Sequence, residues 1–278
     1  TVGFERLLPR KYFSPTDGTR MLLAIDSGNT NIVFAVYDGE TLQSEWRASS
    51  DAKRTADEYG VWLTHLMALD NLKIEDISAS IVATVVPEML FSLKTLCRKY
   101  FKTDPLVVGE AGVEIGVDIL VNEPDEVGAD RLVNAAAAHR RYGGPLIVID
   151  FGTATTFDIV DENGSYCGGV IAPGINLSLD SLHMAAAKLP RVAVQKPKAV
   201  IGTKTVPAMM SGVYWGYVGL IEGLLKRIKG EYGAQMSVVA TGGLAPLFAE
   251  EIDAIEHLDN DLTLRGLSEI YRRNTQSL

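Results

Sequence analysis

Short apolar runs of strand length alternate with amphipathic, helical stretches along the chain. In the first half, apolar runs that end in polar turns predict strands, and a capping box followed by apolar residues on one helical face predicts a helix. A proline after a β-branched run opens a second helix. The predicted elements are the strands Leu22–Asp26, Ile32–Tyr37 and Thr41–Ala48, a helix after Thr55, the strand Ser80–Val86 and a helix from Pro87 through Tyr100.

The same order returns in the second half of the chain. The predicted elements are the strands Leu146–Asp150, Phe157–Val160 and Ser165–Ala172, a helix after Pro173-Gly174 to about Leu189, a helix over Pro207–Lys229, the strand Ser237–Thr241, a helix beginning at Gly242-Gly243 and a closing helix over residues 262–273. A duplication of this length is too long for a solenoid repeat. It predicts two similar α/β halves, each a mixed sheet with helices on its faces, and a ligand cleft between them.

Chain length and turn signals predict where the two halves join. At about 150 residues per domain, 278 residues are expected to hold about two domains. Gly143-Gly144-Pro145 marks the join, so we predict an N-terminal half over residues 21–143 and a C-terminal half over residues 144–278. Met21 stands directly before the first strand, and the stretch before it lacks the apolar core of a signal peptide. We therefore expect residues 1–20 to be an upstream extension or a cloning remnant outside the fold.

Composition and charge narrow the class of protein and its partners. Hydrophobic residues make up 47% of the chain and charged residues 22%, which excludes a disordered or fibrous protein. The net charge of −9 and a pI of about 5.0 disfavour nucleic-acid binding. No apolar run approaches the roughly 18 residues of a membrane span, so no membrane partner is expected. The two cysteines lack a C-x-x-C spacing, which disfavours a zinc site and favours a reducing, cytoplasmic location.

An Asp-x-Gly turn follows the first strand of each half, after Asp26 and after Asp150. The glycine lets backbone amides approach a phosphate, nearby Thr and Asn side chains are neutral donors, and the aspartate suits Mg²⁺ through water. One such turn fits an ordinary hairpin, but two at matching positions predict a clamp for nucleotide phosphates. Gly242-Gly243 fits either a backbone surface for adenine or ribose, or a simple tight turn. The P-loop and dinucleotide-binding patterns are both absent from the sequence.

Four segments together resemble the type III pantothenate kinases, a family of the actin-like and sugar-kinase superfamily. These segments are Asp26–Asn31, Gly128–Arg131, Asp150–Asp158 and Gly168–Gly174. The resemblance keeps the same order from Met21 to about Arg273, and the combination is specific although sugar kinases share the single motifs. It implies an α/β fold of two ribonuclease-H-like halves, which are duplicated βββαβα units with a nucleotide cleft between them. It also implies a homodimer with the substrate pocket near the subunit interface.

The resemblance implies ATP-dependent phosphorylation of pantothenate to 4'-phosphopantothenate, the first step of coenzyme A biosynthesis. Mg²⁺ and a monovalent cation, K⁺ or NH₄⁺, are the implied cofactors. Asp150 would hold the monovalent cation, Asp26 would serve Mg²⁺, and Thr153 would contact ATP. The residues implied for the first phosphate loop are Asp26, Ser27, Gly28, Asn29, Thr30, Asn31, Ile32 and Val33.

The residues that the resemblance implies for pantothenate binding are Gly128, Ala129, Asp130, Arg131 and Thr205, with Asp130 as the general base. Two of these roles also follow from the residues themselves. A guanidinium at Arg131 can hold an anionic substrate locally in a protein whose overall charge repels it. Asp130 is expected to precede a helix over residues 131–142, whose dipole favours the ionised form of a base. Without the family, the same pair fits the start of a surface helix with solvated charges.

Three positions depart from residues that the family often has. Val121 stands in place of Tyr, Lys204 in place of Asn, and Met210 in place of Gln, which leaves details of the pantothenate pocket open. The long helix over Pro207–Lys229 also carries a stripe of glycines. Glycine is unfavourable inside a helix, so the stripe predicts a close approach, either to the sheet of the same chain or to a dimer partner.

Two alternatives to a pantothenate kinase remain from the sequence. One is a kinase of the same superfamily that acts on another small metabolite. The other is a non-catalytic regulator on the same scaffold, which the presence of Asp26, Asp130, Arg131 and Asp150 and the acidic pI disfavour.

Overall fold

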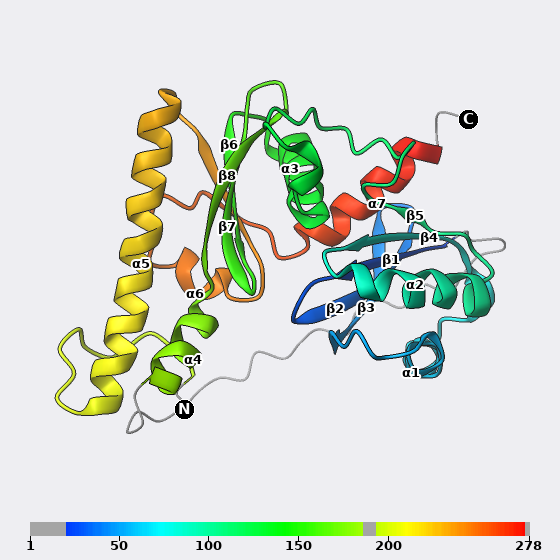
Figure 1. The fold of residues 1–278 in the computed structure, drawn as a ribbon, viewed down its shortest axis with the longest axis horizontal. Coiled ribbons are helices and arrows are strands. Elements are labelled where there is room, and N and C mark those ends of the chain that lie inside the picture. Colours follow the sequence, from blue (N-terminus) through cyan, green and yellow to red (C-terminus); the bar gives the residue numbers. More distant parts are fainter. Residues whose placement is uncertain (1–20, 186–192, 276–278) are drawn as a thin grey trace.

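The computed structural model describes residues 21–185 and 193–275, which form two lobes, each built on one sheet (Figure 1). The predicted extension, residues 1–20, lies outside the described residues. The end of the helix predicted to reach about Leu189 also lies outside them. Among the helices of the described ranges, none is long and apolar enough to cross a membrane.

The N-terminal lobe contains a five-stranded sheet in the order β3-β2-β1-β4-β5. β1, β2 and β3 form an antiparallel meander, whereas β4 runs parallel to β1 and β5 runs parallel to β4. The elements are β1 (Met21–Ser27), β2 (Asn31–Asp38), β3 (Thr41–Ser49), α1 (Ala56–Leu69), η1 (Ile74–Asp76), β4 (Ile77–Thr84), α2 (Pro87–Leu96), η2 (Cys97–Phe101), β5 (Leu106–Val107), η3 (Pro124–Glu126) and α3 (Ala129–Tyr142).

The C-terminal lobe repeats this topology. Its sheet has the order β10-β9-β6-β7-β8, which read from β8 is the order of the first sheet, and the strand directions correspond. The elements are β6 (Leu146–Phe151), β7 (Ala154–Val160), β8 (Tyr166–Pro173), α4 (Ile175–Ala185), α5 (Thr205–Tyr232), β9 (Ser237–Thr241), α6 (Ala245–Ala249), β10 (His257–Leu258) and α7 (Leu262–Thr275). The predicted duplication and the predicted fold class of two similar α/β halves are confirmed.

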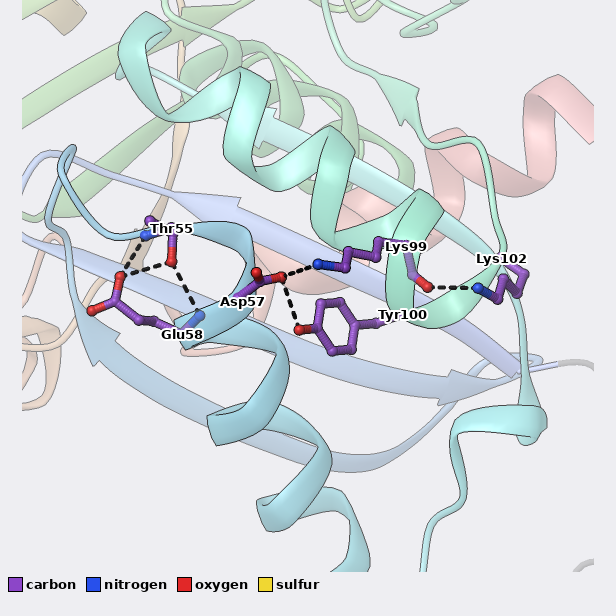
Figure 2. A network of polar contacts seen from close by, with 6 residues as sticks. All are labelled: Thr55, Asp57, Glu58, Lys99, Tyr100 and Lys102. Atoms are coloured by element: carbon purple, nitrogen blue, oxygen red, sulfur yellow. Dashed lines mark hydrogen bonds and ion pairs between the residues drawn. The ribbon is translucent and has the colours of Figure 1, made fainter.

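Figure 2 shows how the first turn of α1 is fixed. The predicted capping box is present, because the amide of Glu58 donates to Thr55 Oγ1 at 3.3 Å and the amide of Thr55 donates to Glu58 Oε2 at 2.7 Å. Asp57 accepts hydrogen bonds from Lys99 Nζ at 2.6 Å and from the Tyr100 hydroxyl at 2.9 Å. These contacts tie α1 to the turn that follows α2, on the side of the first sheet away from the second lobe (Figure 1).

Helices α3 and α7 lie between the two sheets (Figure 1). Leu264, Leu267 and Ile270 of α7 are buried in one cluster with residues of β1, β2 and β4, so the last helix of the chain covers the first sheet. α3 contributes Val133 to that cluster, and its Leu132 is buried in a second cluster that includes residues of β6. The final helix of each half therefore packs against the sheet of the other half. The division of the chain at residues 143 and 144 stays a prediction.

Several element boundaries differ from those predicted. The helix predicted over 131–142 begins at Ala129, so Asp130 lies inside its first turn rather than before it. The second helix ends at Leu96 and continues as the π-helical turn η2, and the long helix begins at Thr205 rather than Pro207. The strands β5 and β10 were not expected, since each has two residues and too short a pattern to register.

Candidate functional site

The two Asp-x-Gly turns meet at the junction of the lobes. Thr30 Oγ1 in the first turn and Thr153 Oγ1 in the second lie 2.6 Å apart and share a hydrogen bond. Each turn is closed by its own backbone, through the Gly28 amide to the Asn31 carbonyl at 3.0 Å and the Gly152 amide to the Ala154 carbonyl at 3.1 Å. The structure therefore places residues from equivalent hairpins, distant in sequence, opposite one another.

Three aspartates gather beside these turns: Asp26 in β1, Asp150 in β6 and Asp130 in α3. Burial raises the pKa of Asp26 to about 7, and the negative charges of Asp130 and Asp150 contribute to that rise while Arg47 opposes it. Burial likewise raises the pKa of Asp150 to about 7, with a contribution from Asp130. The shared region holds more negative charge than its own side chains compensate, which is the electrostatic setting in which a cation binds.

Asp130 is held by the start of α3. Gly128 is the N-cap residue, and the amide of Arg131 donates to Asp130 Oδ1 at 2.8 Å. A Cβ at residue 128 would lie 2.7 Å from the same oxygen, so this arrangement of the carboxylate requires glycine there. Burial raises the pKa of Asp130, and the amide of Arg131 and its charge lower it. Over the described ranges, no other residue's hydrogen bond to Asp130 reaches Oδ2, so this oxygen can accept a hydrogen bond from a substrate hydroxyl.

Asp150 is held from two sides. Asn134 Nδ2 of α3 donates to Asp150 Oδ2 at 3.3 Å, and Thr263 Oγ1 of α7 donates to Asn134 Oδ1 at 2.7 Å. On the other side, Gly242 has a φ of +92°, and a Cβ there would lie 2.5 Å from Asp150 Oδ1. Glycine at the end of β9 therefore lets the chain turn against the carboxylate. The predicted contact of Gly242-Gly243 with adenine or ribose stays a prediction.

Arg131 is paired with a buried aspartate, Asp158, to which the sequence motifs assign no role. Arg131 Nε and Nη2 each lie 2.7 Å from Asp158 Oδ1, and the side chain of Asp158 is fully buried. The Tyr166 hydroxyl donates to the same oxygen at 3.0 Å, and Thr156 Oγ1 donates to Oδ2 at 3.0 Å. The sequence signal that could have found Asp158 is an aspartate within the strand β7, at a position that faces a covered side of the sheet.

Thr205 is not joined to the other predicted residues. It is exposed in the first turn of α5, and no hydrogen bond connects it to Asp26, Asp130, Arg131 or Asp150 within the described part of the chain. The three departures from the family lie in different places. Val121 packs in the cluster that includes Tyr166, Lys204 is the N-cap residue of α5, and Met210 accepts a contact from Gln195.

The side chains beside the turns suit a cation whose ligands include substrate phosphates. They do not form a metal site made of protein side chains alone within the described residues. Over residues 21–185 and 193–275, no three His, Cys, Asp or Glu side chains come close enough to hold a metal ion by themselves. Asp26 and Asp150 nevertheless supply carboxylate oxygens beside the meeting point of the turns. Mg²⁺ in phosphate-transfer sites takes one or two carboxylates together with waters and substrate phosphates. The donor set agrees with that pattern.

The repeated sheets, with the paired turns at their junction, define a two-lobed α/β fold, and its structural neighbours have the fold of the actin-like ATPases and sugar kinases. A structure of the activator of 2-hydroxyisocaproyl-CoA dehydratase from Clostridium difficile with bound ADPNP superposes with a TM-score of 0.54 at 16% identity, covering 92% of this chain and 96% of that one. A Sinorhizobium meliloti protein described provisionally as a 2-dehydro-3-deoxygalactonokinase gives 0.56 at 13% identity, covering 91% and 96%. At these identities the likeness shows the fold.

Sequence relatives identify the family within this class. The family model for type III pantothenate kinase matches residues 22–227. The chain is 71% identical over 255 residues to the type III pantothenate kinase of Paramagnetospirillum magneticum, covering 92% of this chain and 98% of that protein. It is 67% identical over 254 residues to the type III pantothenate kinase of Rhodospirillum rubrum, covering 91% and 99%. The chain belongs to the type III pantothenate kinase family.

Proposed function

We propose that this chain transfers the terminal phosphoryl group of ATP to the primary hydroxyl of pantothenate, giving 4'-phosphopantothenate in the first step of coenzyme A biosynthesis. The observation that carries this conclusion is family membership, at 71% identity to a type III pantothenate kinase over 92% of the chain. Phosphoryl transfer depends mainly on positioning and charge stabilisation. The meeting of two phosphate-binding turns beside Asp130 and Arg131 supports that chemistry.

ATP places its phosphates between the two turns in this proposal. The turn between β1 and β2 with its flanking strand ends, Asp26–Val33, and Thr153 provide backbone amides and hydroxyl groups for the phosphate oxygens. The hydroxyls of Thr30 and Thr153 already lie 2.6 Å apart, so a phosphate between them can replace their direct bond with one bond from each. Both halves of the duplication then act on the same nucleotide.

Pantothenate binds at the start of α3, along Gly128–Arg131. Arg131 binds its carboxylate, and Asp130 removes the proton from its primary hydroxyl as that oxygen attacks phosphorus in line. Burial raises the pKa of Asp130 towards the working pH, which improves a general base as long as the group remains ionised. The first turn of the helix favours that ionised form through the helix dipole.

Asp26 and Asp150 hold the cations in this proposal, Asp26 serving Mg²⁺ through water and Asp150 serving K⁺ or NH₄⁺. Bound cations supply charge neutralisation for the phosphates. The raised pKa values of the two aspartates support the assignment, because a cation at this place offsets the repulsion that burial intensifies. Asn134 and Gly242 hold the carboxylate of Asp150 in place from opposite sides.

The chain forms a homodimer through the C-terminal lobe in this proposal. Large apolar side chains are exposed there on β8, on α4 and in the segment before α5: Ile171, Leu177, Leu182, Met184, Val200 and Ile201. Cβ atoms added at Gly212, Gly216 and Gly219 of α5 would meet nothing within 4 Å in the described part of the chain, so the sheet of the same chain does not explain that glycine stripe. Thr205 begins α5 four residues after Ile201, which agrees with a substrate contact made at the subunit interface.

Turnover tests the assignment directly. With Mg²⁺ and K⁺ present, ATP should be converted to ADP only when pantothenate is added, and absence of that dependence would sink the function. Asp130→Asn should lower kcat at least about 100-fold with little change in ATP affinity, because it removes the base. Asp125→Asn, an exposed acid five positions earlier, is the matched control and should keep the parent rate. A near-parental kcat for Asp130→Asn would remove that residue from its role.

The remaining assignments concern partners and location. Cytoplasmic location and the absence of nucleic-acid partners are proposed from the acidic charge of −9 and the cysteine usage. A panel of small hydroxyl-bearing metabolites, scored by ADP release, separates a pantothenate kinase from a kinase for another metabolite. A regulator that has lost catalysis would release no ADP with any of them.

A further inference from the structure

The pairing of Arg131 with Asp158 fixes how the guanidinium is presented. Asp158 Oδ1 pairs with Arg131 Nε and Nη2, both at 2.7 Å, and accepts a hydrogen bond from the Tyr166 hydroxyl at 3.0 Å. Its other oxygen, Oδ2, accepts a hydrogen bond from Thr156 Oγ1 at 3.0 Å. A carboxylate with hydrogen bonds on both oxygens and no exposed surface has little freedom to move. The Arg131 side chain, by contrast, keeps 15% of its surface exposed.

Two further contacts confine the same arginine. A Cβ at Gly169 would lie 2.5 Å from Arg131 Nη2, so the guanidinium can lie over β8 only because residue 169 has no side chain. The ring of Tyr166 lies with its centroid 5.6 Å from Arg131 Cζ, within the range of a cation–π contact. Guanidinium has five N–H donors in a rigid fork. In the described part of the chain, Nη1 makes no hydrogen bond, so its donors are available to a ligand.

We propose that Asp158 is a positioning residue. It orients the guanidinium of Arg131 so that the remaining N–H groups donate hydrogen bonds to the carboxylate of the substrate. This inference rests on the proposed function, in which Arg131 binds the carboxylate of pantothenate. Asp158 also cancels the charge of Arg131. Recognition of the anion then depends on the direction of the free donors rather than on net positive charge, and the pair favours an acid over a neutral analogue.

Charge and position predict opposite effects of removing the carboxylate. If net charge governed binding, Asp158→Asn would leave Arg131 uncompensated and would lower the KM for pantothenate. If position governs binding, Asp158→Asn frees the guanidinium to swing away and raises that KM. Burial raises the pKa of Asp158 to about 6, opposed by Arg131, so the group is ionised at pH 8, where the parent and the Asn variant differ in charge.

The molecule contains a matched control. Asp259 is also buried, at 7% exposure, accepts a hydrogen bond from the Tyr142 hydroxyl at 2.8 Å and pairs with Arg265. Asp259→Asn therefore makes the same chemical change in a similar buried pair that lies outside the residues proposed to bind substrate. Loss of stability alone should affect both variants, whereas an effect on pantothenate recognition should appear only at Asp158.

Steady-state kinetics of Asp158→Asn at pH 8, with Mg²⁺ and K⁺, tests the proposal. We expect the KM for pantothenate to rise about tenfold or more, with kcat within about threefold of the parent and the KM for ATP unchanged. A neutral amide of pantothenate should keep its KM, so the preference for the acid falls. Asp259→Asn should keep both KM values. An unchanged or lower KM for pantothenate, or an equal change for the amide, overturns the proposal.

Tyr166→Phe provides a second, milder test that applies even where Asp158→Asn does not fold. It removes one hydrogen bond to Asp158 and keeps the ion pair, so the KM for pantothenate should rise about threefold. Tyr142→Phe, which removes the equivalent hydroxyl at Asp259, should leave that KM unchanged. Equal KM values for the two tyrosine variants overturn the proposal. Failure of the parent protein to turn over pantothenate instead overturns the proposed function.

Discussion

Gly242 is the position where a single methyl group is expected to damage both stability and the site. Its φ is +92°, a region that side-chain-bearing residues rarely adopt. A Cβ there would lie 2.5 Å from Asp150 Oδ1 and 2.7 Å from the amide nitrogen of Phe151. The second of these neighbours is backbone of β6, the central strand of the second sheet, so it cannot move aside without shifting that strand. At Gly243, the next residue, an added Cβ would meet nothing within 4 Å in the described part of the chain, and φ is not left-handed.

The expected magnitude follows from these two effects. A left-handed conformation costs a residue with a side chain about 1–2 kcal/mol, and forcing an extra methyl group into a packed site costs about 1–3 kcal/mol. Together they lower the free energy of unfolding by about 2–5 kcal/mol. For a chain of this size, each kcal/mol moves the melting temperature by about 2–4 °C. Gly242→Ala should therefore melt at least about 4 °C below the parent, whereas Gly243→Ala should stay within about 0.5 kcal/mol of it.

Thermal melting and ADP release measured on the same preparations check this prediction. Because the methyl group displaces Asp150, pantothenate-dependent ADP release by folded Gly242→Ala should fall by about 10–100-fold. Gly243→Ala should keep the parent rate. Equal melting temperatures for the two alanine variants would refute the steric reasoning. A destabilised Gly242→Ala with the parent rate would show that the carboxylate of Asp150 does not need its present position.

Two further predictions concern pH and assembly. The pKa of Asp26 is about 7 when folded and about 4 when unfolded, so the folded state binds more protons between these values and loses stability as pH rises through 7. Asp26→Asn should therefore raise the melting temperature of the ligand-free protein at pH 8 much more than at pH 5; equal shifts contradict this. Ile201, 83% exposed, belongs to the proposed dimer surface, so Ile201→Asp should halve the mass seen by light scattering, whereas Val61→Asp on α1, 68% exposed, should not. A dimeric Ile201→Asp would exclude that surface.

The order of elements and the paired turns could be predicted from the sequence because they depend on local patterns. Strand-length apolar runs and the capping box at Thr55 are signals within a few residues of each other. The turns after Asp26 and Asp150 recur at equivalent points of the duplication, so their meeting followed from symmetry. The two turns are far apart in the sequence, but the duplication places them at equivalent points of the two halves, and this equivalence predicts that they meet.

The interactions that complete the site could not be predicted, because they join residues with no repeated or periodic relation. Asp158 was visible only as the last residue of a motif, and its partnership with Arg131 depends on how α3 lies across β7 and β8. The sequence predicts the start of α3 two residues too late, because Ala129 and Asp130 carry no strong helix-start signal beyond Gly128. The location of Thr205, the first residue of α5, next to an exposed apolar face of the C-terminal lobe could not be predicted, because that face is formed only in the folded lobe.

The two helices at equivalent points of the duplication present different side chains at the junction of the lobes. α3 and α7 each close one half, and each packs against the sheet of the other half. The first turn of α3 holds Asp130 and Arg131, whereas the first turn of α7 holds Thr263, which donates to Asn134 of α3. Asn134 in turn donates to Asp150. Helix α7 therefore supports α3 through this chain of hydrogen bonds. Because both helices lie between the two sheets, a change in the angle between the sheets would alter the position of Asp150 relative to Asp130.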